Sequence, residues 1–347
     1  MKTVVISPSG KFYGSEQTLF TFLTNTKNKY DVYVNRNDGK FKNLLAKQNK
    51  HKIHSFRNPI LLYTKLLPHL ILGKYKTLYC NEGGHIRYIK TIAKILPKSR
   101  FVIHIRLTED TNGKRIGKSL PNIKLISVSK YIADLVYNNT KIDTQIISSP
   151  TREIQEKINW NQNINNQKIL RLGIIGRLTP SKGIREMLSF VNYCENKCIN
   201  NLELHFFGDI EEADKLVNDF LSFANNTKYI HSFFHGFKSK IQIFESIDVV
   251  IHFNREEPLG VIFFEALNFG KPFIGFNAGG IGNIAERLEI QNLMLDISSD
   301  WEEQLISQIT NLYLNIEKYK IAQIKMLKEY SIDKYCENLE FNIIGND

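Results

Sequence analysis

Short runs rich in β-branched and aromatic residues alternate with stretches of helical period along the chain. In the first half these runs fall near residues 3–7, 31–34, 77–80, 100–105, 124–128 and 145–147. In the second half they fall near residues 170–175, 203–207, 229–232, 248–252, 272–276 and 293–295. Strands that alternate with helices are typical of parallel sheets with crossover connections. The pattern predicts an α/β protein with a parallel sheet in each half.

The segment between the two halves has a different character. Residues 152–168 are rich in asparagine and lack a strong period, which is typical of a linker. The length of 347 residues also exceeds that of one ordinary domain. We predict a first domain over residues 1–151, this linker, a second domain over residues 169–330 and a C-terminal helix over residues 331–347.

Two charged motifs stand out in the second half. Residues 176–183 read Gly-Arg-Leu-Thr-Pro-Ser-Lys-Gly and follow a predicted strand. Their cations, Arg177 and Lys182, have the charge that a diphosphate needs. Residues 255–272 read Arg-Glu-Glu-Pro-Leu-Gly-Val-Ile-Phe-Phe-Glu-Ala-Leu-Asn-Phe-Gly-Lys-Pro. We expect the two motifs to form one site.

The second motif combines a helix start with two carboxylates. Pro258 and Gly260 suit the beginning of a helix, whose free N–H groups and positive dipole end attract phosphate. Glu257 precedes that helix and Glu265 lies inside it, where its carboxylate can accept hydrogen bonds from sugar hydroxyls. The motif therefore predicts binding of a sugar and a phosphate together.

The two motifs also carry a family resemblance. The pattern Glu-Pro-x-Gly-x4-Glu-Ala-x3-Gly-x-Pro, preceded by Gly-Arg-Leu-x3-Lys-Gly, resembles the nucleotide-sugar glycosyltransferases of family four, the group 1 type. The resemblance implies the GT-B fold, in which two Rossmann-like parallel-sheet domains face each other across a cleft. It also implies transfer with retention of anomeric configuration, a nucleotide held mainly by the second domain and an acceptor held by the first. The final helix, residues 331–347, is expected from the resemblance to return to the first domain.

The resemblance assigns roles to residues of this sequence. The catalytic group that it implies is His104, Arg177, Lys182 and Glu257. The residues that it implies for the donor are Gly14, Phe237, Lys238, Leu259, Gly260, Val261 and Glu265. The residues that it implies for the acceptor are Gly10, Ser15 and Arg106. No metal ligand and no cofactor are predicted, because the sequence contains no Asp-x-Asp motif for a metal-bridged diphosphate.

The first half contributes two of these candidate regions. Its first predicted strand runs into a loop with Gly10 and Gly14 and then into a helix from about Ser15, a suitable place for phosphate or a sugar. His104 lies near the end of the fourth predicted strand and Arg106 follows it, where the carboxyl end of the strand points to the crevice of an open sheet. Arg106 stands near a position that is often acidic in the family, which suggests an anionic or phosphorylated acceptor.

Charge is distributed unevenly along the chain. Residues 1–150 hold 26 Lys+Arg against 8 Asp+Glu, whereas residues 151–347 hold 20 against 27. Residues 40–100 contain fourteen basic residues, interleaved with apolar ones, and a single acid. This segment suits a peripheral anionic membrane surface. Binding to nucleic acid and simple solubilisation of the helices remain alternatives.

Cysteines and apolar runs indicate the compartment. Four cysteines, Cys80, Cys194, Cys198 and Cys336, lack the spacing of a zinc site and fit reduced cytoplasmic thiols. The first residues form a predicted strand rather than a signal peptide, and no apolar run reaches the length of a membrane span. We expect a cytoplasmic enzyme that can attach peripherally to the inner face of the plasma membrane.

These observations give one predicted function and two alternatives. We expect a hexosyl- or N-acetylhexosaminyl-type transferase that moves a sugar from a nucleotide-diphosphate sugar, UDP favoured over GDP, to a glycan or lipid-linked acceptor. Frequent Lys, Asn and Ile suggest an AT-rich bacterial genome and hence surface polysaccharide synthesis. A GT-B nucleotide-sugar epimerase and a basic nucleic-acid-binding protein are the alternatives, although no nucleic-acid module is recognisable.

Overall fold

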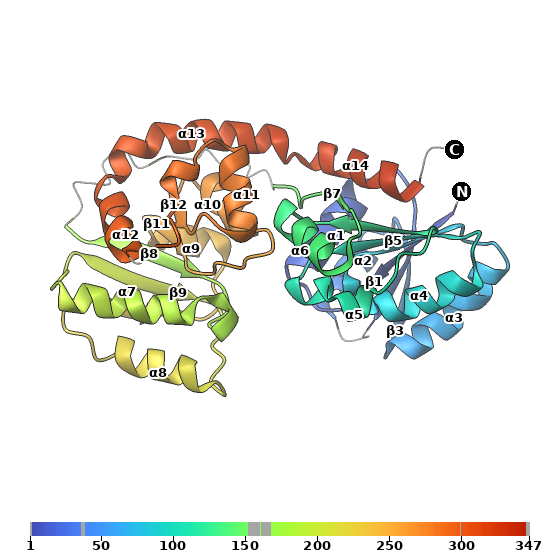
Figure 1. Ribbon diagram of the computed structural model, residues 1–347, viewed down its shortest axis with the longest axis horizontal. Coiled ribbons are helices and arrows are strands. Elements are labelled where there is room, and N and C mark those ends of the chain that lie inside the picture. Colours follow the sequence, from blue (N-terminus) through green and yellow to red (C-terminus); the bar gives the residue numbers. More distant parts are fainter. Residues whose placement is uncertain (1, 36–38, 152–159, 161–167, 299, 345–347) are drawn as a thin grey trace. The chain divides into compact units, whose positions relative to one another are not determined.

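The protein consists of two compact α/β units. Its computed structural model describes residues 2–35, 39–151, 160, 168–298 and 300–344. Unit 1 comprises Met1–Pro150 and Glu329–Asp347, and unit 2 comprises Thr151–Lys328 (Figure 1). Each contains one parallel sheet with helices, so the prediction of two parallel-sheet α/β domains is confirmed. Most of the predicted linker lies outside the described residues.

Unit 1 is built on a seven-stranded parallel sheet of order β3-β2-β1-β4-β5-β6-β7. Its strands are β1 Thr3–Ser7, β2 Asp31–Asn35, β3 Lys52–Phe56, β4 Thr77–Cys80, β5 Arg100–Ile105, β6 Ile123–Ser127 and β7 Gln145–Ile146. Its helices are α1 Gly14–Asn25, α2 Lys40–Ala46, α3 Pro59–Ile71, α4 Ile86–Ile95, α5 Gly113–Ile116, α6 Lys130–Thr140 and α14 Ile332–Ile344. The strand order reverses between β1 and β4, where open parallel sheets bind ligands outside the carboxyl ends of their strands.

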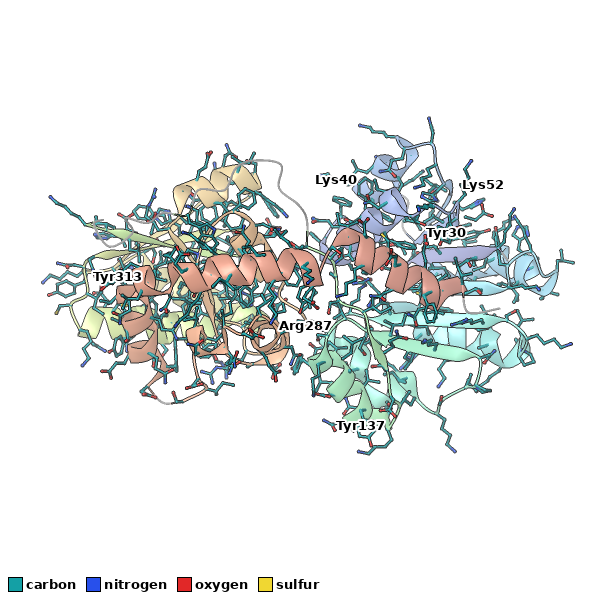
Figure 2. All side chains as sticks on the ribbon, turned by 90° about the horizontal axis from the view of Figure 1, so that it is seen from above. Tyr30, Lys40, Lys52, Tyr137, Arg287 and Tyr313 are labelled. Atoms are coloured by element: carbon teal, nitrogen blue, oxygen red, sulfur yellow. The ribbon has the colours of Figure 1, made fainter. Side chains whose placement is uncertain are left out.

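The C-terminal helix α14 completes the core of unit 1. Tyr335, Leu339 and Ile343 of α14 are buried in one cluster with residues of α1, β1 and β2. Tyr30 lies in this cluster, close to α14 (Figure 2). Burying such apolar side chains contributes about 1.5–3 kcal/mol each. The last helix is therefore an integral part of unit 1.

Unit 2 is built on a five-stranded parallel sheet of order β10-β9-β8-β11-β12. Its strands are β8 Leu170–Ile175, β9 Leu202–Phe207, β10 His231–Phe234, β11 Val249–His252 and β12 Phe273–Gly275. Its helices are α7 Ile184–Asn196, α8 Lys215–Ala224, α9 Lys240–Ser246, α10 Val261–Asn268, α11 Gly279–Arg287, α12 Trp301–Thr310 and α13 Leu312–Glu329. Here the order reverses between β8 and β11. None of the helices in the described part of the chain is long and apolar enough to cross a bilayer.

The observed strands differ from the predicted ones in three places. The edge strand β3 was not predicted, because its sequence Lys-Ile-His-Ser-Phe has few apolar residues. Strand β10 begins later than predicted, since the N–H groups of residues 228–230 donate to the Glu195 carboxylate and are unavailable to the sheet. The predicted strand at 293–295 is wrong: residues 291–293 form a 3₁₀ turn and Leu295 makes only an isolated bridge to Phe276.

Candidate functional site

The two charged motifs meet at the point where the strand order of unit 2 reverses. Residues 176–183 follow β8, and the second motif follows β11, the neighbouring strand. A 3₁₀ turn, Pro180–Lys182, leads from the first motif into α7, and α10 starts inside the second. Carboxyl ends of adjacent parallel strands share one edge of the sheet, which explains why residues far apart in the sequence come together.

Lys182 and Glu257 form the centre of this edge. The Lys182 Nζ atom donates to Glu257 Oε2 at 2.8 Å, and Asn254 Nδ2 donates to the same oxygen at 2.9 Å. His252 Nε2 lies 3.4 Å from Oε2. Among the described residues, no hydrogen bond is made by Glu257 Oε1, so this oxygen can accept one from another group. The sequence analysis selected Lys182 and Glu257 as candidates, but not Asn254 or His252.

The ionisation of Glu257 is fixed by its surroundings. Burial alone would raise the pKa of Glu257, but the neighbouring His252 imidazole and the Lys182 ammonium outweigh burial and hold that pKa well below its usual range. Glu257 is therefore a carboxylate at neutral pH. Its charge in turn holds the Lys182 ammonium at the carboxyl edge of β8 and β11.

Two glycines allow the loops of this edge to approach each other. Gly183 has φ +82°, and a Cβ atom there would lie 2.4 Å from the Phe253 carbonyl oxygen. Gly260 has φ +94°, and a Cβ atom there would lie 2.1 Å from Ile281 Cδ1. Glycine adopts such conformations without the strain that other residues would suffer. Gly183 is thus required by close packing against the Phe253 backbone, and Gly260 by its backbone conformation.

The start of α10 presents backbone donors next to this centre. Gly260 precedes the helix, Leu259 is buried, and Val261 is the first helical residue. The first N–H groups of a helix have no partner within it and carry the positive end of its dipole. Arg177 is exposed directly after β8. The predicted phosphate-binding groups of unit 2 therefore lie in loops along one edge of its sheet.

Glu265 lies one turn inside α10 and has a partner that the sequence did not reveal. Its Oε1 atom is bound by the Nζ atom of Lys240, the first residue of α9. The side chains of Glu265 and Lys240 are 21% and 40% exposed, so the pair is within reach of a ligand. A charge pair between residues of different helices has no local sequence signal, which is why Lys240 was missed.

The loop between β10 and α9 contains the remaining donor candidates. Phe237 is 72% exposed, and Lys238 is exposed as well. Gly236 has φ +64°, and its carbonyl oxygen accepts a hydrogen bond from the Gly208 N–H at 3.0 Å. This bond fastens the loop to the carboxyl end of β9. Phe237 and Lys238 therefore project from an anchored loop of unit 2.

The glycine loop of unit 1 lies at the corresponding edge of the other sheet. Gly10 is buried in the loop after β1, Gly14 is the exposed first residue of α1, and Ser15 follows it. The Ser15 carbonyl oxygen accepts a hydrogen bond from Asn81, which follows β4. These three candidates thus lie near the point between β1 and β4 where the strand order of unit 1 reverses.

Glu82 is a further carboxyl group at this edge that sequence reasoning did not select. Burial raises the pKa of Glu82 to about 7, and the charge of Glu16 adds to that shift, although a hydrogen bond from Ser15 opposes it. It is the single acid among residues 40–100. Its isolation within a basic segment was the one feature of the sequence that could have identified Glu82 as a candidate.

His104 and Arg106 are placed inside unit 1 rather than at its surface. His104 is fully buried, with Nε2 3.1 Å from the Ile147 carbonyl oxygen and Nδ1 3.1 Å from the Tyr79 hydroxyl. Since a carbonyl only accepts, Nε2 carries the proton. Burial and the charge of Arg106 lower the pKa of His104 well below its usual range, so the ring is neutral.

The Arg106 guanidinium is surrounded by neutral partners. Its N–H groups donate to the Asn81 carbonyl oxygen, the Ser149 hydroxyl, His104 Nδ1 and the Tyr335 hydroxyl, at 2.9 to 3.2 Å. Only 5% of the residue is exposed. With its donors engaged in this way, Arg106 joins the sheet to α14 and offers no exposed charge to an anionic acceptor.

The four cysteines are free thiols, and Cys198 is the exposed one. Within the described residues, no group of three His, Cys, Asp or Glu side chains is arranged to hold a metal ion. The candidates fall into two sets, one at the sheet edge of each unit.

Comparison with known proteins identifies a family match over part of the chain and several solved structures with a similar fold. Residues 154–322 match the family described as Glycosyl transferases group 1. No curated protein matches the sequence. Among solved structures, HepE of Anabaena in complex with UDP and glucose has a TM-score of 0.74 at 19% identity, over 100% of both chains.

Two further solved structures are similar over nearly their full length. TarM of S. aureus, in complex with fondaparinux, α-GlcNAc-glycerol and UDP, has a TM-score of 0.73 at 12% identity, over 100% of both chains. The lipopolysaccharide outer core galactosyltransferase WaaB has a TM-score of 0.71 at 14% identity, over 99% of both chains. At such identities the likeness establishes the fold, that of GT-B glycosyltransferases.

Proposed function

We propose that this chain, a member of the Glycosyl transferases group 1 family with the GT-B fold, is a retaining glycosyltransferase that uses a UDP-sugar. The observation that carries the proposal is the Lys182–Glu257 pair, where the strand order of unit 2 reverses. The family match favours transfer over the two alternatives, epimerisation and nucleic-acid binding. Retention of configuration rests on the motif resemblance.

The chemistry requires stabilisation of the leaving group. As the bond between the sugar and the diphosphate breaks, negative charge grows on the diphosphate. Arg177, Lys182 and the N–H groups at the start of α10 are the groups that would receive it. Loss of one preorganised donor of this kind costs roughly 3–4 kcal/mol of barrier. These donors supply the positive charge without a metal ion, so we propose that transfer needs none.

Glu257 and Glu265 have different roles in this proposal. Glu257 orients Lys182 through Oε2 and offers Oε1 to the hydroxyls of the donor sugar. Glu265 accepts hydrogen bonds from the ribose hydroxyls of the nucleotide. Phe237 and Lys238 would border the base. UDP is favoured over GDP because HepE and TarM are both similar in fold and contain UDP in their complexes.

Calorimetric binding of UDP and GDP tests the proposal. We expect wild-type protein in EDTA to bind UDP in the micromolar range and GDP more weakly. Glu265→Ala should weaken UDP binding at least tenfold, about 1.4 kcal/mol. Lys325→Met is the matched control, because Lys325 forms an ion pair with Glu289 elsewhere in unit 2. Absence of UDP binding by wild-type protein, or an unchanged affinity in Glu265→Ala, contradicts the assignment.

The acceptor that we propose is a glycan or lipid-linked glycan of bacterial surface polysaccharide synthesis, approached from the cytoplasmic membrane face. The supporting observation is the exposed face of α3 and the residue after it, with Ile60, Leu61, Ile71 and Leu72. Helix α4 contacts α3 through the stacked rings of Tyr63 and Tyr88, 5.2 Å apart. The same two helices also carry the exposed cations Lys65, Arg87 and Lys94.

This surface suits an anionic bilayer, since apolar side chains insert shallowly while lysines attract the headgroups. Basic residues such as Lys40 and Lys52 also lie on the surface of unit 1 (Figure 2). We expect the protein to sediment with vesicles containing anionic phospholipid and not with neutral vesicles. Leu72→Glu should abolish sedimentation, whereas Ile324→Glu, at an exposed site in unit 2, should not. Equal sedimentation of the two variants contradicts membrane docking.

A further inference from the structure

Lys240 and Glu265 belong to a matched contact between two helices. Lys240 begins α9 and Glu265 lies within α10, and their side chains form an ion pair. One turn later on each helix, the rings of Phe244 and Phe269 stack, with centroids 4.3 Å apart and planes 12° from parallel. The same face of α9 therefore meets the same face of α10 at two successive turns. A stacked aromatic pair fixes this spacing more firmly than a partly exposed ion pair does.

The start of α9 is itself fixed in position. Ser239 precedes the helix and forms a capping box with Gln242: its hydroxyl oxygen accepts from the Gln242 N–H, and the Gln242 side chain accepts from the Ser239 N–H. Capping of this kind holds the first turn of a helix in place. Lys240 is the first residue of that turn. Its side chain therefore starts from a defined backbone position.

We propose that Lys240 is a positioning residue of the donor site, which holds the Glu265 carboxylate in the orientation that receives the ribose hydroxyls. This inference rests on the proposed function, in which Glu265 binds the ribose. Lys240 occupies Oε1, and among the described residues Oε2 makes no hydrogen bond. The carboxylate therefore presents one oxygen to the ligand while the other is held by the protein.

Two physical effects follow from this arrangement. A glutamate side chain has several rotatable bonds, and fixing them before the ligand arrives lowers the entropic cost of binding. The Lys240 ammonium also balances the charge of Glu265, which would otherwise repel a diphosphate. The first effect depends on the ribose hydroxyls and the second on the diphosphate, so a ligand that keeps the diphosphate and lacks one ribose hydroxyl tests the first effect alone.

The experiment compares UDP with its 2′-deoxy analogue, by calorimetry, on wild-type protein, Lys240→Met and Lys240→Arg. We expect wild-type protein to prefer UDP by about tenfold, because the analogue lacks one ribose hydroxyl. Lys240→Met should weaken UDP binding about tenfold and remove most of the preference. Lys240→Arg should restore most of both, since arginine also pairs with a carboxylate. Lys325→Met is the control and should match wild-type protein.

Each other outcome has a distinct meaning. If Lys240→Met keeps the full preference for UDP, or binds UDP more tightly than wild-type protein, the positioning role is wrong even though the donor site stands. Lys240→Gln, with circular dichroism of each variant, provides a second substitution should the first disturb folding. If wild-type protein binds neither ligand, the proposed function fails, and the positioning role fails with it.

Discussion

The carboxyl edges of the two sheets use charge in opposite ways. In unit 2, Lys182 pairs with Glu257 and Lys240 with Glu265, and each pair keeps part of its side chains exposed. In unit 1, Arg106 is buried among neutral partners. A partly exposed pair can share its charges with a ligand at small cost. A buried cation whose donors are engaged cannot do so without breaking several hydrogen bonds, each worth about 1 kcal/mol.

This difference separates binding chemistry from architecture. The motifs of unit 2 provide reachable anions and cations, as expected for a site that binds a charged nucleotide. His104 and Arg106 of unit 1 hold together β5, the loop after β4, residues 147–149 and α14. Substitutions of these charged groups should therefore affect different measurements: activity and affinity for the ion pairs of unit 2, and stability for Arg106 of unit 1.

The largest effect is expected at Lys182. Lys182→Met removes a cation that would stabilise the leaving diphosphate and leaves Glu257 without its main partner. We expect a loss of roughly 10²–10³ in the rate of UDP release at saturating donor and acceptor. Lys325→Met should retain the wild-type rate. A loss of less than tenfold in Lys182→Met would place leaving-group stabilisation elsewhere.

The next effect concerns the packing of the two loops in unit 2. Gly183→Ala places a Cβ atom 2.4 Å from the Phe253 carbonyl oxygen at φ +82°. We expect a loss of about 2–3 kcal/mol in unfolding free energy, measured by urea denaturation, and weaker UDP binding. Gly73→Ala is the control, since Gly73 has φ +69° but open space around it and should cost only about 1 kcal/mol. Equal losses in both variants would mean that the contact with Phe253 is unimportant.

Arg106 provides the contrasting test in unit 1. Arg106→Leu breaks the hydrogen bonds that join the loop after β4, Ser149 and Tyr335 of α14. We expect a loss of about 2 kcal/mol in unfolding free energy, while UDP affinity stays unchanged because the variant leaves unit 2 intact. Urea denaturation and calorimetry give the two quantities. A loss of UDP affinity without loss of stability would assign Arg106 to binding instead.

The smallest effect is the pH dependence of two carboxyl groups, which should have opposite signs. Burial raises the pKa of Glu82 to about 7, so the folded state binds the extra proton and its stability falls as pH rises from about 4.5 to about 7. The depressed pKa of Glu257 gives a contribution that is present above about pH 4.5 and lost as pH falls further.

Variants at Glu82 and Glu257 test these signs by urea denaturation between pH 4 and pH 8. Relative to wild-type protein, Glu82→Gln should gain about 1–2 kcal/mol in unfolding free energy as pH rises from 5 to 8. The amount by which the unfolding free energy of Glu257→Gln lies below that of wild-type protein should decrease toward pH 4. Parallel pH curves for wild-type protein and both variants would show that neither carboxyl group titrates differently on folding.

The sequence by itself determined the class of fold and one half of the site. Alternating apolar runs located most strands within one or two residues, because the periods of strands and helices are local properties of the chain. The spacing of Glu257, Pro258, Gly260 and Glu265 predicted a helix start flanked by two carboxylates, and α10 begins at Val261 as expected. Turn and cap chemistry is local too, so these features could be predicted without a structure.

Only the tertiary structure decided which side chains are partners. Lys182 and Glu257 are 75 residues apart in the sequence, Lys240 and Glu265 are 25 apart, and Arg106 and Tyr335 are 229 apart. Burial of His104 and Arg106 likewise depends on the loops and on α14, which pack over the end of β5. Such contacts arise where strand ends and distant helices converge, and no local period records that convergence.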